Sequence, residues 1–438
     1  MSALTEAGEG VVRSGKTAFV GGALPGETVR FRRIRRHRQH DDAMLLEVVE
    51  AVSARVTPRC AHFGTCGGCA LQHLSAERQI EEKQTQLRTA LERIARTTGQ
   101  EWLPPLTGPQ WSYRRRARLG ARFVFKKGRV VVGFRERVSP YVAALERCEV
   151  LAAPVGSLIA PLARMLTQLS IRERVPQIEV AVADNATALV LRVLAAPSGA
   201  DLEQLRAFER EHAVRLYLQP GDLRSVTRIK SESDAPQQPE PALRYALPEF
   251  GLELEFEPTD FVQINAEVNR ALVVRAVELL ELTPESRVLD LFCGLGNFTL
   301  ACARRAASVT GVEAESYLVE RARHNARLNG ISNAQFATID LAQPEALSGP
   351  WLPAGITHVL LDPPRVGARD VMRTIARLAP KRLLYISCHP GSLARDVGML
   401  VHDHGFVLRA TGVLDMFPHT THVESLALLT PGNENCVT

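Results

Sequence analysis

The segment Val288–Asn297, with the sequence VLDLFCGLGN, is the stretch that most clearly indicates the fold. Its apolar first half is typical of a buried strand, and Gly294 and Gly296 then let the backbone turn sharply and pass close to a ligand. Another strand-like piece, Ser308–Gly311, follows, and from about residue 283 strand and helix patterns alternate. This alternation predicts an α/β domain with a doubly wound, Rossmann-like parallel sheet that binds ligands at the carboxyl ends of its strands.

The glycine-rich turn indicates a cofactor that contains a ribose. Glu313 lies about 20 residues beyond the turn, where an acidic side chain accepts hydrogen bonds from ribose hydroxyls. A dinucleotide fingerprint would require a third glycine near position 299, where this chain has Thr299. The turn therefore favours S-adenosylmethionine (SAM), which has no pyrophosphate, over NAD, although two glycines alone are a weak signal. Asp340 ends a further strand-like piece and could contact an adenine amino group.

A thiol follows another predicted strand of the same domain. Leu383–Ile386 is apolar, and Cys388 comes just after it and before Pro390. Asp362 follows a second apolar piece, and the two prolines after it fix an extended loop. We expect Cys388 and Asp362 to face the same cleft at the carboxyl edge of the sheet. Because a buried cysteine is more often an inert packing residue, its role depends on such neighbours.

A thiol beside a SAM site suggests methylation of a carbon that is a poor nucleophile. Nitrogen and oxygen attack the methyl group directly, but carbon 5 of a pyrimidine first needs a thiolate to add at carbon 6. A base must later remove the carbon 5 proton so that the thiol can leave. Glu424 begins an apolar run and could be that base, although a glutamate at the start of a strand is normally just solvated.

A separate group of cysteines indicates a metal centre. Cys60, Cys66 and Cys69 are closely spaced around Gly67 and Gly68, and Cys148 lies far along the chain. Four thiolates could hold zinc or an iron–sulfur cluster. Zinc sites more often consist of two close pairs, so three close cysteines with one remote one favour a [4Fe–4S] cluster.

The size of the chain predicts two or three domains. It has 438 residues, of which 45% are hydrophobic and 23% charged, an ordinary composition for a globular protein. Residues 1–57 alternate short strand patterns with glycine-rich turns and fit a five-stranded OB-type barrel. Residues 58–248 form a predicted central α+β domain with a helix over 75–96 and a polar, Pro-rich linker at 231–241, and residues 249–438 form the catalytic domain.

The helix predicted over residues 75–96 has a clear start and one apolar face. Ser75 is a plausible N-cap. Residues spaced three, four and seven apart along the segment are apolar, which is typical of a face turned to the core. The predicted core positions are Ile80, Leu87, Leu91 and Ile94.

The charge distribution and the N-terminal sequence limit the expected cellular location of the protein and its expected partners. No long apolar run predicts a membrane span, and the first residues do not have the pattern of a signal peptide, so a cytoplasmic protein with reduced cysteines is expected. The net charge is only +5, but arginines crowd residues 30–38 and 114–122. Such clusters can neutralise phosphates of RNA or DNA, or they can be solvated faces.

The chain resembles the bacterial RNA uracil-C5 methyltransferases over nearly its whole length. The motifs that carry the resemblance are C-x5-C-G-G-C at 60–69, TDFVQIN at 259–265, DLFCGLGNFT at 290–299, LDP at 361–363, SC at 387–388 and DMFPHT at 415–420. It is most similar to the branch that acts on 23S rRNA and carries both a TRAM domain, an OB-type RNA-binding module, and a [4Fe–4S] cluster.

The resemblance implies a role for each matching residue. Cys388 would be the nucleophile and Glu424 the base. Cys60, Cys66, Cys69 and Cys148 would hold the [4Fe–4S] cluster, and residues 1–57 would be the TRAM domain. The residues that would line the SAM pocket are Gln263, Phe292, Asn297, Glu313, Asp340 and Asp362.

Two alternatives remain open at this point. One is a non-catalytic RNA-binding iron–sulfur protein, for which Cys388 would be dispensable. The other is an enzyme of the same chemistry that acts on tRNA or on another 23S rRNA uridine. The leading expectation is a monomeric enzyme, without an obligate protein partner, that methylates a flipped-out uridine of 23S rRNA.

Overall fold

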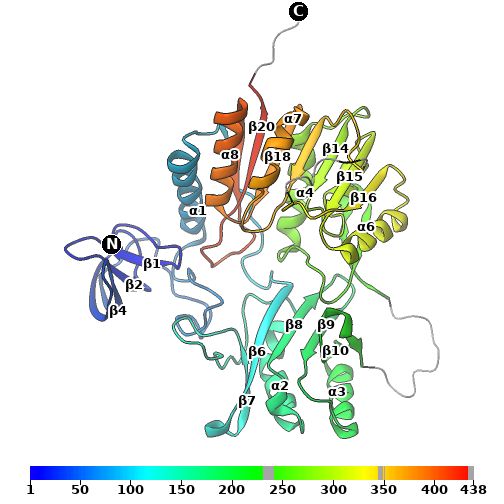
Figure 1. The fold of residues 1–438 in the computed structure, drawn as a ribbon. Helices are drawn as coiled ribbons and strands as arrows, with labels where there is room; N and C mark the ends of the chain where they lie inside the picture. The colour runs from blue at the N-terminus through cyan, green and yellow to red at the C-terminus, as the bar shows by residue number, and fades with distance from the viewer. Residues whose placement is uncertain (230–240, 344–348, 350, 433–438) are drawn as a thin grey trace, which may run out of the picture.

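The computed structural model describes residues 1–229, 241–343, 349 and 351–432, and Figure 1 shows three neighbouring parts. A small N-terminal β module lies beside a central α+β domain, and the C-terminal domain lies next to both. Nearly all of the Pro-rich linker predicted at 231–241 falls outside the described residues, so its conformation stays a prediction.

The C-terminal domain is built on a mixed sheet with the strand order β16-β15-β14-β17-β18-β20-β19-β5. Strands β14 to β18 pair in parallel, whereas β20 is antiparallel to β18 and β19. The strands are β14 (Arg287–Leu291), β15 (Ser308–Glu313), β16 (Ala334–Thr338), β17 (His358–Leu361), β18 (Arg382–Ser387), β19 (Phe406–Leu414), β20 (Glu424–Pro431) and β5 (Glu101–Trp102). The strand order reverses between β15-β14 and β17-β18, which is where open α/β sheets bind ligands.

Helices cover both faces of this sheet, so the doubly wound arrangement predicted from the sequence is confirmed. The helices of the domain are α4 (Ala266–Leu280), α5 (Thr299–Ala303), α6 (Ser316–Leu328), α7 (Met372–Leu378) and α8 (Pro390–His404). Side chains alternate between the faces of a strand. Val288 accordingly packs in the core formed with α4, α5 and α6, and Leu289 packs in the core formed with α7 and α8. Among the described residues, no helix is both long and apolar enough to span a bilayer.

A helix from the cysteine-rich part of the chain also packs on this domain. Helix α1 (Ala76–Ala90) contacts α8 and β19, and Figure 1 shows it beside α8. The predicted N-cap is confirmed, because the Ser75 side chain accepts a hydrogen bond from the backbone N–H of Arg78. After residue 90 the helix continues as a π-helical turn, Leu91–Ala95. The sheet of the C-terminal domain thus packs against residues that the sequence assigned to the central domain.

The predicted core face of this helix is partly wrong. Leu87 and Leu91 are fully buried and Ile80 packs against the core, as predicted. Ile94, however, is 51% exposed, and Ala95 takes the buried position. The wider π-helical turn rotates the last residues of the helix relative to an α-helical period, so the periodicity fails there.

The central domain contains a sheet with the order β11-β10-β9-β8-β6-β7. The hairpin predicted around residues 126–128 is confirmed, because β6 and β7 pair antiparallel. The elements are β6 (Arg116–Val124), β7 (Arg129–Gly133), α2 (Val155–Gln168), β8 (Gln177–Val182), β9 (Thr187–Arg192), α3 (Gly199–His212), β10 (Arg215–Gln219) and β11 (Thr227–Arg228). The next hairpin, β12 (Leu243–Leu247) with β13 (Leu252–Phe256), packs instead into the core of the C-terminal domain.

The N-terminal module has the strand order β1-β2-β4-β3. Its strands are β1 (Glu9–Val12), β2 (Ala18–Gly21), β3 (Thr28–Arg36) and β4 (Asp41–Glu50). The core is small, with Ala18, Val20, Ala23 and Ala43 buried. Met1 hydrogen-bonds to Gly26 and Glu27 next to the start of β3, so the two edges of the sheet approach each other. Closure into a five-stranded barrel stays a prediction.

Candidate functional site

The two predicted catalytic residues come together at the carboxyl edge of the sheet. Cys388 directly follows β18, and Glu424 is the first residue of β20. The antiparallel ladder of these strands ends with Ser387 opposite Ser425. Extending the register by one residue places Cys388 opposite Glu424, and Cα atoms of facing residues in such a ladder lie about 4.5–5.5 Å apart. Strand pairing therefore explains why these two side chains are neighbours.

Burial keeps protons on these groups. It raises the pKa of the Cys388 thiol to about 11, and the nearby carboxyls of Glu424 and Asp362 add to the shift. It also raises the pKa of Glu424 well above its usual range, with a further contribution from Asp362 and an opposing one from Lys83. Asp362, which follows β17, has its pKa raised to about 7 by burial. The site can therefore gain or release protons near neutral pH.

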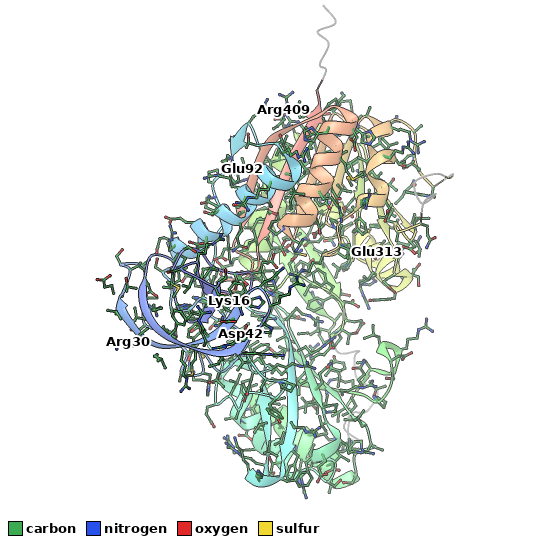
Figure 2. All side chains as sticks on the ribbon, turned by 60° about the vertical axis from the view of Figure 1, so that its left-hand side comes forward. Lys16, Arg30, Asp42, Glu92, Glu313 and Arg409 are labelled. Atoms are coloured by element: carbon green, nitrogen blue, oxygen red, sulfur yellow. The ribbon has the colours of Figure 1, made fainter. Side chains whose placement is uncertain are left out.

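The glycine-rich turn after β14 forms a cradle at the same edge. Gly294 has a φ of +55° and open space where a Cβ would point. Its backbone N–H donates to Oε2 of Glu313 at 3.1 Å, and Oε1 of that carboxylate accepts from the N–H of Ala314 at 2.8 Å. The preceding Phe292 has a φ of +65°, a backbone conformation that costs a non-glycine residue about 1–3 kcal/mol and clusters at ligand sites. Figure 2 labels Glu313 on this domain.

Asp290, a carboxyl that was not among the predicted site residues, lies beneath this turn. It is buried on β14, and its Oδ2 accepts a hydrogen bond from the Thr299 hydroxyl at 2.5 Å, whereas Oδ1 has no partner within the described residues. Burial, reinforced by the carboxyls of Asp362 and Glu313, raises its pKa to about 7. The sequence contained one sign of this contact, because Thr299, which donates to Asp290, stands where a dinucleotide fingerprint has its third glycine.

The other predicted cofactor residues differ in how free their side chains are. Gln263 lies at the cleft, because its Nε2 donates to Oδ2 of Asp362 at 3.2 Å. Asn297 exchanges two hydrogen bonds with Asn269, at 3.0 and 3.1 Å, and accepts one from Tyr245 at 2.9 Å. Asp340 is exposed, and its carboxylate accepts hydrogen bonds within its own turn. Their roles toward a cofactor stay predictions.

The four predicted cluster cysteines line one cavity in the structure. All four are half-buried. Burial raises the pKa of Cys66 to about 11 and that of Cys69 to about 12, and the other thiols add to both shifts. A Cβ on Gly67 would lie 2.9 Å from the Arg135 carbonyl oxygen, and one on Gly68 would lie 3.0 Å from the Phe134 ring. Both glycines are therefore required for the loop to approach the central domain this closely.

A large groove lies between the central domain and the loop that precedes β20. It has a volume of about 1190 Å³, and its lining includes Thr420, Thr421 and His422, which lead directly to Glu424. Two aromatic rings, Phe134 and Tyr141, also line it. The basic residues in its wall are Arg114, Arg118, Arg122, Lys127, Arg135 and Arg137. Arg114, Arg118 and Arg122 of the second arginine cluster thus line this groove, whereas Arg115 and Arg116 do not.

The first arginine cluster lies on β3 of the N-terminal module. Arg30 is paired with Glu47, and Arg33 with Asp41, both at 2.5 Å. Arg32, Arg35 and Arg36 are exposed, and the structure records no ion pair for them within its described residues. Figure 2 shows Arg30 at the outer edge of this module. A positively charged surface therefore remains available on this part of the molecule.

Comparisons with known proteins are consistent with this site. Residues 249–348 and 353–431 match the family "tRNA (Uracil-5-)-methyltransferase". The chain is 48% identical over 429 residues to the 23S rRNA (uracil(1939)-C(5))-methyltransferase RlmD of Alkalilimnicola ehrlichii, covering 98% of this chain and 95% of that protein. It is also 48% identical over 431 residues to the protein of the same name from Nitrosococcus oceani, covering 98% and 94% of the two chains.

A solved structure has the same fold over the whole chain. The crystal structure of the Pyrococcus abyssi tRNA (uracil-54, C5)-methyltransferase in complex with S-adenosyl-L-homocysteine superimposes with a TM-score of 0.73 at 22% identity, covering 98% of this chain and 99% of the other. The resemblance and the methyltransferase fold predicted from the sequence are confirmed. The chain belongs to the RNA uracil-C5 methyltransferase family and is a SAM-dependent enzyme of that class.

Proposed function

We propose that this enzyme methylates carbon 5 of one specific uridine in 23S rRNA, of the position 1939 type, through a covalent adduct with Cys388. The observation that carries the proposal is the position of Cys388 opposite Glu424, at the sheet edge that also bears the glycine-rich turn. The choice of 23S rRNA is supported by the names of relatives that are 45–48% identical over nearly the whole chain.

In the proposed reaction the Cys388 sulfur bonds to carbon 6 of uracil, which makes carbon 5 nucleophilic. Asp362, with a pKa near 7, is suited to accept the thiol proton. SAM would supply the methyl group: the bond between the methyl carbon and the sulfonium sulfur breaks as the methyl carbon bonds to carbon 5, and S-adenosylhomocysteine is the leaving group. Glu424 then takes the carbon 5 proton, and the released electron pair re-forms the C5–C6 double bond as the bond from sulfur to carbon 6 breaks.

The cradle after β14 fits SAM. The Glu313 carboxylate at the end of β15 is suited to accept hydrogen bonds from ribose hydroxyls. The unpartnered Oδ1 of buried Asp290 can accept a hydrogen bond from a donor on a bound ligand, which would remove the cost of leaving it unpaired. We assign Gln263, Phe292 and Asp362 to the same pocket, with Asn297 and Asp340 at its margins.

We further propose that Cys60, Cys66, Cys69 and Cys148 hold a [4Fe–4S] cluster. A Zn–S bond of about 2.3 Å in a tetrahedral site would place the sulfur atoms about 3.8 Å apart. Within the described residues, no three of these sulfur atoms lie within 4.8 Å of one another, which favours a cluster over a single ion. Burial and the neighbouring thiols raise the pKa of Cys66, Cys69 and Cys148, so these thiols are costly to ionise, and a bound cationic cluster would compensate that cost.

Replacing Cys69 with serine is expected to remove the cluster. The anaerobically purified variant should lose its iron, measured by metal analysis, and the visible absorption of the cluster, and its unfolding temperature should fall because the ligands also anchor the loop. Cys388→Ala is the matched control, since it removes a thiol elsewhere and should retain iron. Stoichiometric zinc in the unaltered protein, without iron, would contradict the cluster.

We propose that RNA lies in the basic groove, with the N-terminal module acting as a TRAM-type RNA-binding domain. The groove offers several cations for phosphates and aromatic rings for unstacked bases, and its wall includes the loop residues Thr420–His422 that precede Glu424. The exposed arginines of β3 extend the positive surface onto the N-terminal module.

Removing a cation from the groove is expected to weaken RNA binding in a salt-dependent way. Arg122 is exposed in the groove, and no ion pair is recorded for it in the described part of the chain. For Arg122→Gln, the slope of log affinity against log salt should fall by about one because one phosphate contact is lost. Arg210→Gln, on α3 and outside the groove lining, is the control; equal slopes for both variants would place the RNA elsewhere.

The main competing function is the same chemistry on tRNA, which the names of the matched family and of the solved structure both favour. The deciding experiment is methyl transfer from labelled SAM to unmodified 23S rRNA and, separately, to tRNA, with the product nucleoside mapped. We expect 5-methyluridine at one 23S position. Label in tRNA alone would overturn the proposed substrate, and no label in either RNA, with SAM bound, would support a non-catalytic RNA-binding protein.

A further inference from the structure

Helix α1 contains a buried lysine whose charge is directed at the catalytic edge. The Lys83 side chain is fully buried, although lysine is almost never so without a partner. Its Nζ donates to Oδ1 of Asp415 at 2.6 Å and to the carbonyl oxygen of Phe417 at 3.0 Å. Both partners lie more than 330 residues further along the chain. These two hydrogen bonds attach helix α1 to the loop that joins β19 to β20.

This loop leads straight to the proposed base. The β19–β20 ladder ends with Leu414 paired to Glu424, so Asp415 directly follows the residue that faces Glu424. One turn before Lys83 on α1, buried Gln79 makes a second attachment, because its Oε1 accepts the backbone N–H of His419 at 2.8 Å. Helix α1 therefore holds the loop at two points, through the amide of Gln79 and through the positive charge of Lys83.

The groups around Glu424 carry charges of both signs. Asp362 after β17 and the Cys388 thiol after β18 share its pocket, and the Asp362 carboxyl disfavours ionisation of Glu424. Asp415, His419 and His422 lie on the loop with which Lys83 interacts, and Arg365 faces Cys388 and His422. Lys83 is the neighbour that favours the ionised form of Glu424, and it in turn is held in its charged form by Asp415 and Glu424 against burial, which lowers its pKa.

We propose that Lys83 is a positioning residue for the base: it fixes the 415–423 loop and supplies the positive charge that favours the ionised form of Glu424, against its burial, when the carbon 5 proton must leave. The inference rests on the proposed function of Glu424. Only an ionised Glu424 can accept that proton. Without the neighbouring charge, methyl transfer would still occur, but the bond from Cys388 to carbon 6 would persist because the electron pair of the C5–H bond is not released.

The test uses the full-length enzyme and an RNA substrate with tritium at carbon 5 of the uridine, so that tritium released into water reports proton removal. In Lys83→Met, the folded pKa of Glu424 should rise because a nearby cation is lost. A higher pKa lowers the ionised fraction of Glu424 at neutral pH. Tritium release should therefore slow about tenfold at neutral pH, a methylated SDS-resistant adduct should accumulate, and release should recover as the pH is raised.

Matched variants separate charge from structure. Lys83→Arg keeps the charge and should restore release, and Arg93→Met removes an exposed charge from the π-helical turn that follows α1 and should behave like the unaltered enzyme. Lys83→Met leaves Asp415 buried without its partner, so the double variant Lys83→Met/Asp415→Asn provides the same test if the single variant unfolds on heating at a much lower temperature.

Each outcome decides the inference. Normal tritium release with an unchanged pH profile in Lys83→Met and in the double variant would overturn it. Loss of adduct formation together with release, without recovery at higher pH, would also overturn it and leave Lys83 with a purely structural role. Glu424→Gln is run in parallel: if that variant fails to accumulate an adduct, the proposed function of Glu424 fails, whatever Lys83 does.

Discussion

Replacing Cys388 with alanine is expected to abolish methyl transfer while leaving the protein folded. The thiol sits half-buried just beyond β18, and within the described residues no ion pair depends on it, so its loss should change the free energy of unfolding by about 1 kcal/mol or less. Without the sulfur no nucleophile can add to carbon 6. Loss of a covalent nucleophile typically lowers turnover by about four or more orders of magnitude. Single-turnover transfer from labelled SAM measures the effect.

Two further measurements make this result specific. SAM binding and the thermal unfolding temperature of Cys388→Ala should match those of the unaltered enzyme, because neither depends on the nucleophile. Cys388→Ser should also be inactive, since a hydroxyl is a far weaker nucleophile than a thiolate. Measurable turnover by Cys388→Ala would mean that methyl transfer does not pass through this residue.

Replacing Glu424 with glutamine is expected to trap the enzyme on its RNA. The amide has nearly the same shape as the carboxyl but cannot accept the carbon 5 proton, so methylation should proceed while release of the RNA slows. A general base contributes about 10²–10⁴-fold, and release should slow by that factor. The expected product is an RNA–protein adduct that survives SDS and carries the labelled methyl group.

The double variant Cys388→Ala/Glu424→Gln is the control for this adduct and should form none. Loss of activity in Glu424→Gln without an adduct would assign Glu424 a different role. Stability gives a second readout. Burial raises the pKa of Glu424 in the folded state, so ionisation destabilises the fold as the pH rises through that pKa. Glutamine does not ionise, and the variant should therefore be at least as stable as the unaltered enzyme under alkaline conditions.

Local patterns were sufficient for the fold of the catalytic domain. The apolar run before Gly294 and the alternation of strand and helix patterns after residue 283 each depend on a few adjacent residues. Such patterns can be recognised without knowing how the chain packs. The same holds for the cysteine spacing at 60–69 and for Ser75 as a helix cap. Periodicity failed at Ile94, where a π-helical turn rotated the helix and no local residue marked the change.

The chemistry of the site needed both kinds of information. The residue types and the family motifs indicated Cys388 and Glu424 from the sequence, but strand register alone explains how the two become neighbours. In the sequence, Thr299 was informative only because it replaces a glycine of the dinucleotide fingerprint. The structure shows that its hydroxyl donates a hydrogen bond to buried Asp290.

By itself, the sequence determined that this chain has a Rossmann-like domain, a thiol at a strand end and a set of cysteines suited to a metal centre, because these depend on residue type and short spacing. Only the tertiary structure showed that Gln79 and Lys83 hold the loop before Glu424. The sequence analysis considered only the apolar positions of this helix and did not consider these two polar residues. The reason is physical: a buried charge is stable only beside its partner, and Asp415 reaches Lys83 through the packing of α1 on the sheet rather than through proximity along the chain.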